Sequence, residues 1–187
     1  MDADRRRSTD VIESLPAPGT AAPSNWERFE DLYRSSRDDL YAYVATLLRD
    51  PTAAEDITAQ AFERAYRRRR TFDRRRGEER AWLFGIARNA ALDELRRRRR
   101  VSALVAEPAD DGLVADDDGA EVALRRTAVQ AALAELPARE REVVALKFHA
   151  GMSNAEMAQV LGVSESNAGT LLHRTMQKLR KACDDQA

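Results

Sequence analysis

The chain of 187 residues is long enough for one ordinary domain or two small ones, and 34% of its residues are charged while only 6% are aromatic. No apolar run approaches the roughly 20 residues of a membrane-spanning helix, and the N-terminal residues lack the apolar core of a signal peptide. The single cysteine, Cys183, excludes an intrachain disulfide and a zinc site built from cysteines. These features predict a helical, highly charged protein of a reducing cytoplasm.

The net charge of −1 conceals a strong separation of charges along the chain. Residues 67–100 contain fourteen arginines and five acidic residues, whereas residues 101–124 contain seven acidic residues and no Lys or Arg. Blocks of one sign are typical of polyanion-binding faces and of interaction tails. The basic block therefore predicts a surface for nucleic acid, with a nonspecific basic patch as the alternative.

The first part of the chain predicts a disordered leader followed by a three-helix domain. Residues 1–24 are rich in Pro, Ala, Ser and charge, a composition that disfavours a packed structure. A first helix is expected from about Asn25 to Asp50, and Asp50-Pro51 then supplies the cap and first residue of a second helix, which ends in the arginines at 67–70. A third helix is expected at about residues 79–100, after a glycine-containing loop at 72–80. The predicted domain covers residues 25–100.

An acidic linker and a second helical domain are expected to follow. Residues 101–120 contain Pro108, two glycines and clustered aspartates, which predict a flexible linker. The second domain, at about residues 121–182, begins with a helix closed by Leu136-Pro137 and continues with a helix at 139–148 and a two-helix unit. No segment shows strand alternation over any length, so the predicted fold class is all-α, in two small domains of modest stability.

The stretch from Asn154 to Arg174 predicts a helix-turn-helix. Gly162 permits the positive φ that the turn needs, and Ala158 is small where the second helix crosses the first. A plain helical hairpin packed against a third helix is the alternative. Gly169 fits either a destabilising mid-helix glycine or a close approach of the helix to a DNA backbone.

The second helix of this unit carries the predicted DNA contacts. Its N-terminal N–H groups suit a phosphate, its first polar side chains can bond base edges or phosphates, and its later basic residues can contact the DNA backbone. The predicted contacts are Ser164, Ser166, Asn167, Thr170, His173, Arg174 and Lys178. Since no Lys or Arg precedes Arg174 in this helix, we expect it to bind DNA weakly by itself.

The third helix and the loop before it supply the missing positive charge. Arg pairs bidentately with phosphate or guanine, and Asn pairs with adenine. The helical candidates recur at a spacing of three and four residues, which places them roughly on one face. The predicted nucleic-acid contacts are Arg74, Arg75, Arg76, Arg80, Arg88, Asn89, Asp93, Arg96 and Arg97.

Three blocks of the sequence resemble the extracytoplasmic-function (ECF) group of bacterial sigma factors. They are AEDITAQAFERAYRRR, FDRRRGEERAWLFGIARNAALDELRRRRR and LPAREREVVALKFHAGMSNAEMAQVLGVSESNAGTLLHR. The blocks occur in the family's order and spacing, and the resemblance covers about residues 26–181, with a dissimilar linker.

The resemblance implies a subunit that directs core RNA polymerase to promoters and helps to open them. The helix bearing Asp56 and Gln60 would dock a coiled coil of the polymerase, whose beta and beta-prime subunits are the expected partners. Residues 72–97 would read and melt the −10 element, with Tyr66, Phe72, Trp82 and Phe84 available for stacking, although Trp82 fits the core better. The helix-turn-helix would bind the −35 element, and an anti-sigma factor is a further expected partner.

This chain departs from the family pattern at several positions. Ala59 and Gln60 stand where the polymerase-binding helix commonly has Gln and Glu, and Gly169 and Leu171 depart from the usual recognition helix. The −35 sequence that the family prefers therefore cannot be assigned to this chain. Leu171 fits contact either with a thymine methyl group or with the protein interior.

Two other classes of function compete with the sigma-factor interpretation. A stand-alone helix-turn-helix regulator would leave the first domain without a role and would need a dimerisation helix that the sequence does not show. A recombinase would need a nucleophile among clustered arginines or a fixed set of carboxylates, and Asp116–Asp118 lie in the predicted linker. We therefore expect a cytoplasmic protein that is not an enzyme, with no catalytic, cofactor, metal or small-molecule site and no membrane partner.

Overall fold

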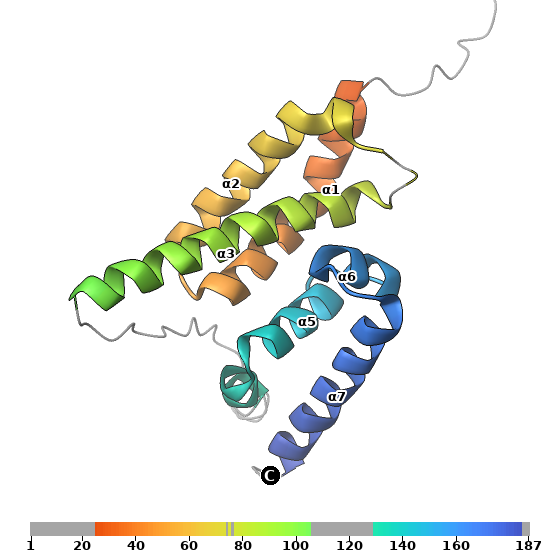
Figure 1. Cartoon of the computed structure of the whole chain (residues 1–187). Coiled ribbons are helices and arrows are strands. Elements are labelled where there is room, and N and C mark those ends of the chain that lie inside the picture. The colour runs from red at the N-terminus through yellow and green to blue at the C-terminus, as the bar shows by residue number, and fades with distance from the viewer. Residues whose placement is uncertain (1–24, 74, 76, 106–128, 185–187) are drawn as a thin grey trace, which may run out of the picture.

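A computed structural model describes residues 25–73, 75, 77–105 and 129–184 (Figure 1). The first helices are α1 (Asn25–Leu48), α2 (Pro51–Arg68), a 3-10 turn (Arg69–Thr71) and α3 (Glu79–Val105). A helical segment at residues 129–135 is followed by α5 (Ala138–Phe148), α6 (Asn154–Leu161) and α7 (Glu165–Asp184). The described part of the chain contains no strand, which confirms the all-α class. The predicted leader, most of the predicted linker and residues 121–128 lie outside the described residues.

The junction between α1 and α2 has the predicted cap. The Asp50 side chain accepts a hydrogen bond from the Ala53 N–H at 3.0 Å, and Pro51 is the first helical residue. Arg98 of α3 donates to the same Asp50 carboxylate at 2.7 Å and to Glu94 at 2.8 Å. The Ala53 hydrogen bond, and then that of Arg98, lower the Asp50 pKa. One arginine therefore ties the end of α3 to the start of α2.

Helix α3 is longer than the sequence analysis predicts. It continues through Val105, so residues 101–105 of the predicted linker are helical. No Gly or Pro interrupts the chain there before Pro108, and Glu94 pairs with Arg97 and Arg98 one turn later. Such spacing stabilises a helix, and helix formation then propagates at little cost until a breaker is reached.

The predicted helix-turn-helix geometry is confirmed at each of its local signals. Gly162 has φ 67° and ψ 39°, the left-handed conformation that ends α6. The Ser164 Oγ accepts from the Asn167 N–H at 3.3 Å and caps α7. At the start of α6, Ser153 and Glu156 form a capping box that the sequence analysis did not single out.

The two groups of helices share one hydrophobic core. We call α1–α3 the N-terminal unit, and the helices from residue 129 onward the C-terminal unit. Helix α5 packs against α1 and α6 packs against α3, while α7 lies on the far side of α5 and α6 (Figure 1). Leu40 and Phe84 belong to the same buried cluster as Leu146 and Met157. Two small domains of modest stability were expected, and neither unit is large enough to cover the apolar faces of this cluster alone.

No helix among the residues that the structure describes is long and apolar enough to cross a membrane.

The shared core predicts coupled unfolding. Leu146 is fully buried in the C-terminal unit, whereas both tryptophans, Trp26 and Trp82, belong to the N-terminal unit. Leu146→Ala should lower the free energy of unfolding by about 2–5 kcal/mol, through lost transfer energy and a residual cavity. The same decrease should be measured in urea by tryptophan fluorescence and by circular dichroism. Two separate transitions, with tryptophan fluorescence unaffected by the substitution, would contradict a shared core.

Candidate nucleic-acid interface

The predicted −35 contacts lie together on the outer face of α7. Ser164, Ser166, Asn167, Thr170, His173, Arg174 and Lys178 are all exposed. Four of them, Ser166, Thr170, His173 and Arg174, line a shallow depression with Asn154, Glu165 and Gly169. The depression offers many hydrogen-bonding groups but one permanent positive charge, and Glu165 would repel a phosphate. Its chemistry therefore suits reading base edges more than holding a polyanion.

The structure resolves two questions that the α7 sequence left open. A Cβ atom at Gly169 would lie 3.2 Å from the Asn154 Nδ2, so the glycine permits close approach of α7 to the start of α6. Neither of the expected explanations of Gly169 includes this contact. Leu171 packs against the shared core, which favours the interior alternative.

Lys178 of the α7 face forms an ion pair within the protein. Its Nζ lies 2.5 Å from the Glu140 Oε1 of α5, although 56% of the lysine side chain stays exposed. An exposed ion pair of this kind is weak, so a phosphate can compete with Glu140 for the ammonium group.

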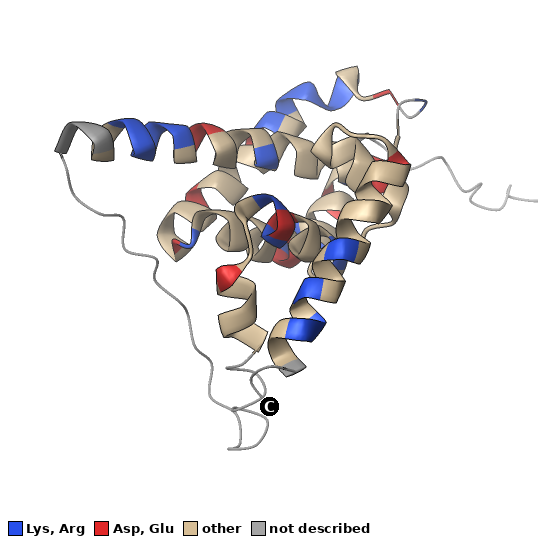
Figure 2. Cartoon of the chain, turned by 60° about the horizontal axis from the view of Figure 1, so that its bottom comes forward, with Lys and Arg blue, Asp and Glu red and all other residues tan. Residues whose placement is uncertain are grey.

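The outer half of α3 forms a second exposed face. Asp93, Arg96 and Arg97 are exposed there, and Asn89 is exposed in the first half of the helix. Figure 2 shows the basic residues as a blue stretch on this helix. Arg96 pairs with Asp93 at 2.8 Å and Arg97 pairs with Glu94 at 2.7 Å. These pairs pre-orient the arginines along the helix but leave their charges accessible to a polyanion.

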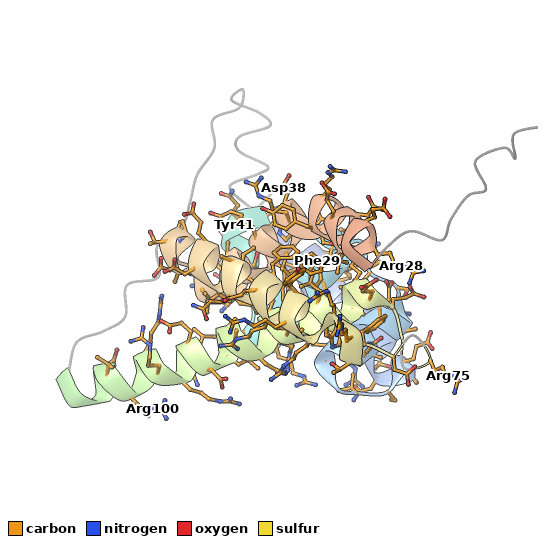
Figure 3. All side chains as sticks on the ribbon, turned by 90° about the horizontal axis from the view of Figure 1, so that it is seen from above. Arg28, Phe29, Asp38, Tyr41, Arg75 and Arg100 are labelled. Carbon is orange, nitrogen blue, oxygen red and sulfur yellow. The ribbon has the colours of Figure 1, made fainter. Side chains whose placement is uncertain are left out.

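The loop before α3 adds a further basic group at the opposite end of the helix. Arg75 is exposed there, far from Arg100 near the other end of α3 (Figure 3). Its backbone N–H donates to the Asp73 side chain at 3.0 Å. Arg74 and Arg76 lie outside the described residues.

Arg80 and Arg88 occupy the contact between the two units instead of the exposed face. Arg80 lies 2.5 Å from the Asp39 Oδ2 of α1 and also donates to the Ala150 carbonyl oxygen of the C-terminal unit. The Arg88 Nε donates to the Glu142 Oε1 of α5 at 2.5 Å. The Arg88 side chain is only 17% exposed. In this arrangement both guanidinium groups are less accessible to nucleic acid than those of the exposed arginines.

Glu142 is the centre of a buried polar group that the sequence analysis missed. We call Tyr43, Arg88 and Glu142 the Glu142 cluster. The Tyr43 hydroxyl donates to the Glu142 Oε1 at 3.0 Å, and the Glu142 side chain is 5% exposed. The available sequence signal is spacing, because Glu142 lies one turn before Ala145 and Leu146 on the buried face of α5.

The environment of the Glu142 cluster shifts the pKa values of Tyr43 and Arg88. Burial, and then the nearby Glu142 carboxylate, raise the Tyr43 pKa well above its usual value, so the phenol stays a donor. Burial alone would lower the Arg88 pKa, but the hydrogen bond and charge of Glu142 outweigh it and raise that pKa. The Arg88 guanidinium therefore stays charged beside Glu142.

The aromatic residues expected near the −10 surface differ in accessibility. Phe72 and Trp82 contact each other with ring centroids 5.3 Å apart, and Trp82 also packs against the core. Tyr66 contacts Phe29 and lies under the Arg69 guanidinium, 3.9 Å from the ring centroid. Phe84 is fully buried and unavailable for stacking on a base, which corrects that expectation.

The predicted polymerase contacts lie on an exposed face of α2. Asp56 and Gln60 are exposed one turn apart. Other residues of α2 line a groove of about 500 Å³ between α1 and α2. The groove is lined by Tyr33, Arg37, Asp38, Tyr41, Glu55, Thr58, Ala59 and Phe62. Thr58 carries a buried hydroxyl oxygen without a hydrogen-bond partner. Asp38 and Tyr41 are labelled on this side of the molecule in Figure 3.

Comparison with known proteins gives two family matches in the order expected. Sigma-70 region 2 matches residues 32–101, and Sigma-70, region 4 matches residues 126–179. The ECF RNA polymerase sigma factor BldN of Streptomyces coelicolor is 32% identical over 100% of this chain and 69% of BldN. This chain belongs to the ECF RNA polymerase sigma factors. SigL of Mycobacterium tuberculosis, another ECF RNA polymerase sigma factor, is 32% identical over 80% of this sigma factor and 85% of SigL.

Two solved structures share the fold of the sigma factor. One is the sigma factor RpoE in complex with the anti-sigma factor NepR from Bartonella quintana, with a TM-score of 0.68, 21% identity and coverage of 84% of this chain and 97% of that chain. The other is CnrH in complex with the cytosolic domain of CnrY, with a TM-score of 0.62, 26% identity and coverage of 88% and 92%.

Family membership establishes the general function. The sigma factor works with RNA polymerase and directs it to promoters, which favours this interpretation over the stand-alone regulator. Sigma factors act in transcription initiation as non-catalytic proteins. Among the residues placed in the structure, no group of three or more His, Cys, Asp or Glu side chains could hold a metal ion.

The ion pairs of α3 predict an acid-sensitive helix end. Hydrogen bonds from Arg97 and Arg98 lower the Glu94 pKa from 4.5 to about 2. Because the folded-state pKa lies below that of the unfolded chain, the stabilisation is complete above pH 4.5 and is lost as the pH falls toward 2. NMR titration should give the low Glu94 pKa, and the helical shifts of residues 95–100 should decline over the same range. Glu94→Gln should remove the pH dependence, and titration of Glu94 near 4.5 would contradict the prediction.

Proposed function

We propose that this sigma factor divides promoter recognition between its units once it is mounted on core RNA polymerase. The N-terminal unit docks the polymerase through α2 and reads and melts the −10 element through α3 and its preceding loop. The C-terminal unit binds the −35 element in duplex form through α7. The observation that carries the proposal is the occurrence of two separate exposed faces, one rich in arginine and one rich in neutral polar groups, in a chain that belongs to this family.

The weak charge of the α7 face supports recognition by a tethered module. The face has Arg174 and the partly paired Lys178 but also Glu165, so a free C-terminal unit would bind DNA poorly. Attachment to polymerase makes this contact effectively intramolecular, at a local concentration of roughly millimolar for a short flexible link. The arginines of α3 and the polymerase then supply most of the electrostatic attraction to phosphate.

The partners follow from the same proposal. The polymerase contact is assigned to the beta and beta-prime subunits, the nucleic-acid ligand is promoter DNA, and the protein acts in the bacterial cytoplasm. An anti-sigma factor is a further proposed partner. Its support is that both similar solved structures are complexes, one of them explicitly with an anti-sigma factor.

The decisive experiment is transcription from genomic templates by core polymerase with the purified protein added. Sequencing of the transcripts should give new start sites that share an upstream motif. Binding to an operator without polymerase, and no new start sites with polymerase, would overturn the proposal in favour of a stand-alone regulator.

The exposed arginines of α3 should contribute to promoter opening. Arg96→Ala with Arg97→Ala should reduce open-complex formation at such a promoter and lower the slope of log K against log salt by about 1 per lost phosphate contact. Permanganate footprinting across a salt series measures both quantities. Arg34→Ala on α1 is the control, because Arg34 is equally exposed and is paired with Glu30 one turn away. Unchanged opening in the double variant would remove these residues from the DNA-facing surface.

The exposed face of α2 should determine affinity for polymerase. Asp56→Arg with Gln60→Ala should weaken binding to core polymerase by about tenfold or more, since charge reversal at an interface centre costs at least 1.4 kcal/mol. Fluorescence anisotropy of labelled protein titrated with core enzyme measures the change. Asp31→Arg, an equal charge reversal at an exposed position of α1, should retain the affinity. Equal affinities for the two variants would exclude this face of α2 as the docking site.

A further inference from the structure

Hydrogen bonds join the C-terminal unit to both α1 and α3, and the two from α3 come from the first half of that helix. Glu142 of α5 accepts from Arg88, and the Ala150 carbonyl oxygen accepts from Arg80. Gly77 lies against Gln159 of α6, so closely that a Cβ atom at Gly77 would fall 1.9 Å from the Gln159 Oε1. The C-terminal unit therefore covers the start of α3 and leaves the outer half exposed.

The Glu142 carboxylate is satisfied only while the two units are in contact. Both of its donors, Tyr43 and Arg88, belong to the N-terminal unit, on α1 and α3. Removal of one partner of a buried ion pair is strongly destabilising because the other charge is left without compensation. The closed arrangement therefore depends on the charge of Glu142, because loss of that charge would leave the Arg88 guanidinium buried without a counter-charge.

The same carboxylate competes with nucleic acid for Arg88. A carboxylate bound to a guanidinium occupies the donors that would otherwise contact a phosphate oxygen. Arg88 is among the residues assigned to the −10 surface, and its side chain is 17% exposed. In the closed arrangement, Glu142 thus occupies the position of a phosphate on α3.

We propose that Glu142 is an internal latch, which holds the free protein in a closed state and withholds Arg80 and Arg88 from nucleic acid. Only an open state presents the whole length of α3 to a polyanion. The identity of that polyanion as promoter DNA rests on the proposed function, whereas the closed state and its latch do not.

The test compares conformation and nucleic-acid affinity in full-length variants. Donor and acceptor dyes are placed at two exposed positions, Thr52→Cys on α2 and Gln177→Cys on α7, in a Cys183→Ser background. Glu142→Gln should lower the energy-transfer efficiency. It should also tighten binding of a fluorescein-labelled forked DNA of mixed sequence by about tenfold, because the binding-competent fraction increases.

The matched control is Glu135→Gln, which makes the same change of net charge at an exposed position of the C-terminal unit. Its energy transfer should equal that of the parent, and its affinity change measures the contribution of one charge alone. Tyr43→Phe removes one donor to Glu142 and keeps the ring, so it should give a smaller shift in the same direction. If circular dichroism shows that Glu142→Gln does not fold, the Tyr43→Phe variant tests the latch in its place.

Two outcomes would overturn the latch. One is a folded Glu142→Gln protein with unchanged energy transfer, and the other is an opened protein that binds the forked DNA no more tightly than Glu135→Gln. Failure of the proposed function is a separate result, because it would appear as the absence of promoter-specific transcripts with core polymerase, whatever the distance between the dyes.

Discussion

A buried carboxylate needs hydrogen-bond donors, and this constraint determines how the two units of the protein pack against each other. Glu142 receives its donors from two helices of the other unit, which fixes α5 against α1 and α3 at one place. The buried cluster that the two units share is apolar and includes Phe84, Leu146 and Met157. Apolar packing supplies most of the attraction but little directional information, whereas the buried ion pair specifies one register of the two units.

Under the proposed function, the distribution of charge would make each of the two exposed faces a weak ligand for DNA by itself. The α7 face reads polar groups with little electrostatic attraction, and the inner part of the arginine-rich α3 is occupied by groups of the same chain. Polymerase binding that separated the units would expose apolar surface from the shared core, so the polymerase would have to cover that surface or hold the units apart. Affinity for DNA would then depend on assembly with the polymerase.

The local parts of the structure were predictable, whereas the contacts between distant segments were not. Asp50 and Gly162 confirm the sequence analysis because caps and turns depend on a few adjacent residues. Spacing along α3 put Arg88 and Arg96 on one face, but α5 supplies a buried partner for Arg88 while Arg96 stays exposed. The sequence of α3 does not indicate this difference, because the partner of Arg88 is 54 residues away along the chain. The assignment of function came from the order of the motifs, and the individual site residues remain predictions.

The five consecutive arginines that end the basic block are not equivalent. Arg98 bridges the carboxylates of Asp50 and Glu94 and so holds the cap of α2 against α3, while the arginines at 96, 97, 99 and 100 face solvent. A lysine could keep the positive potential at the exposed positions, but one ammonium group cannot reproduce a planar fork that engages two acids at once. Evolutionary exchange between Arg and Lys within this run should therefore be free at the solvent-facing sites and restricted at Arg98.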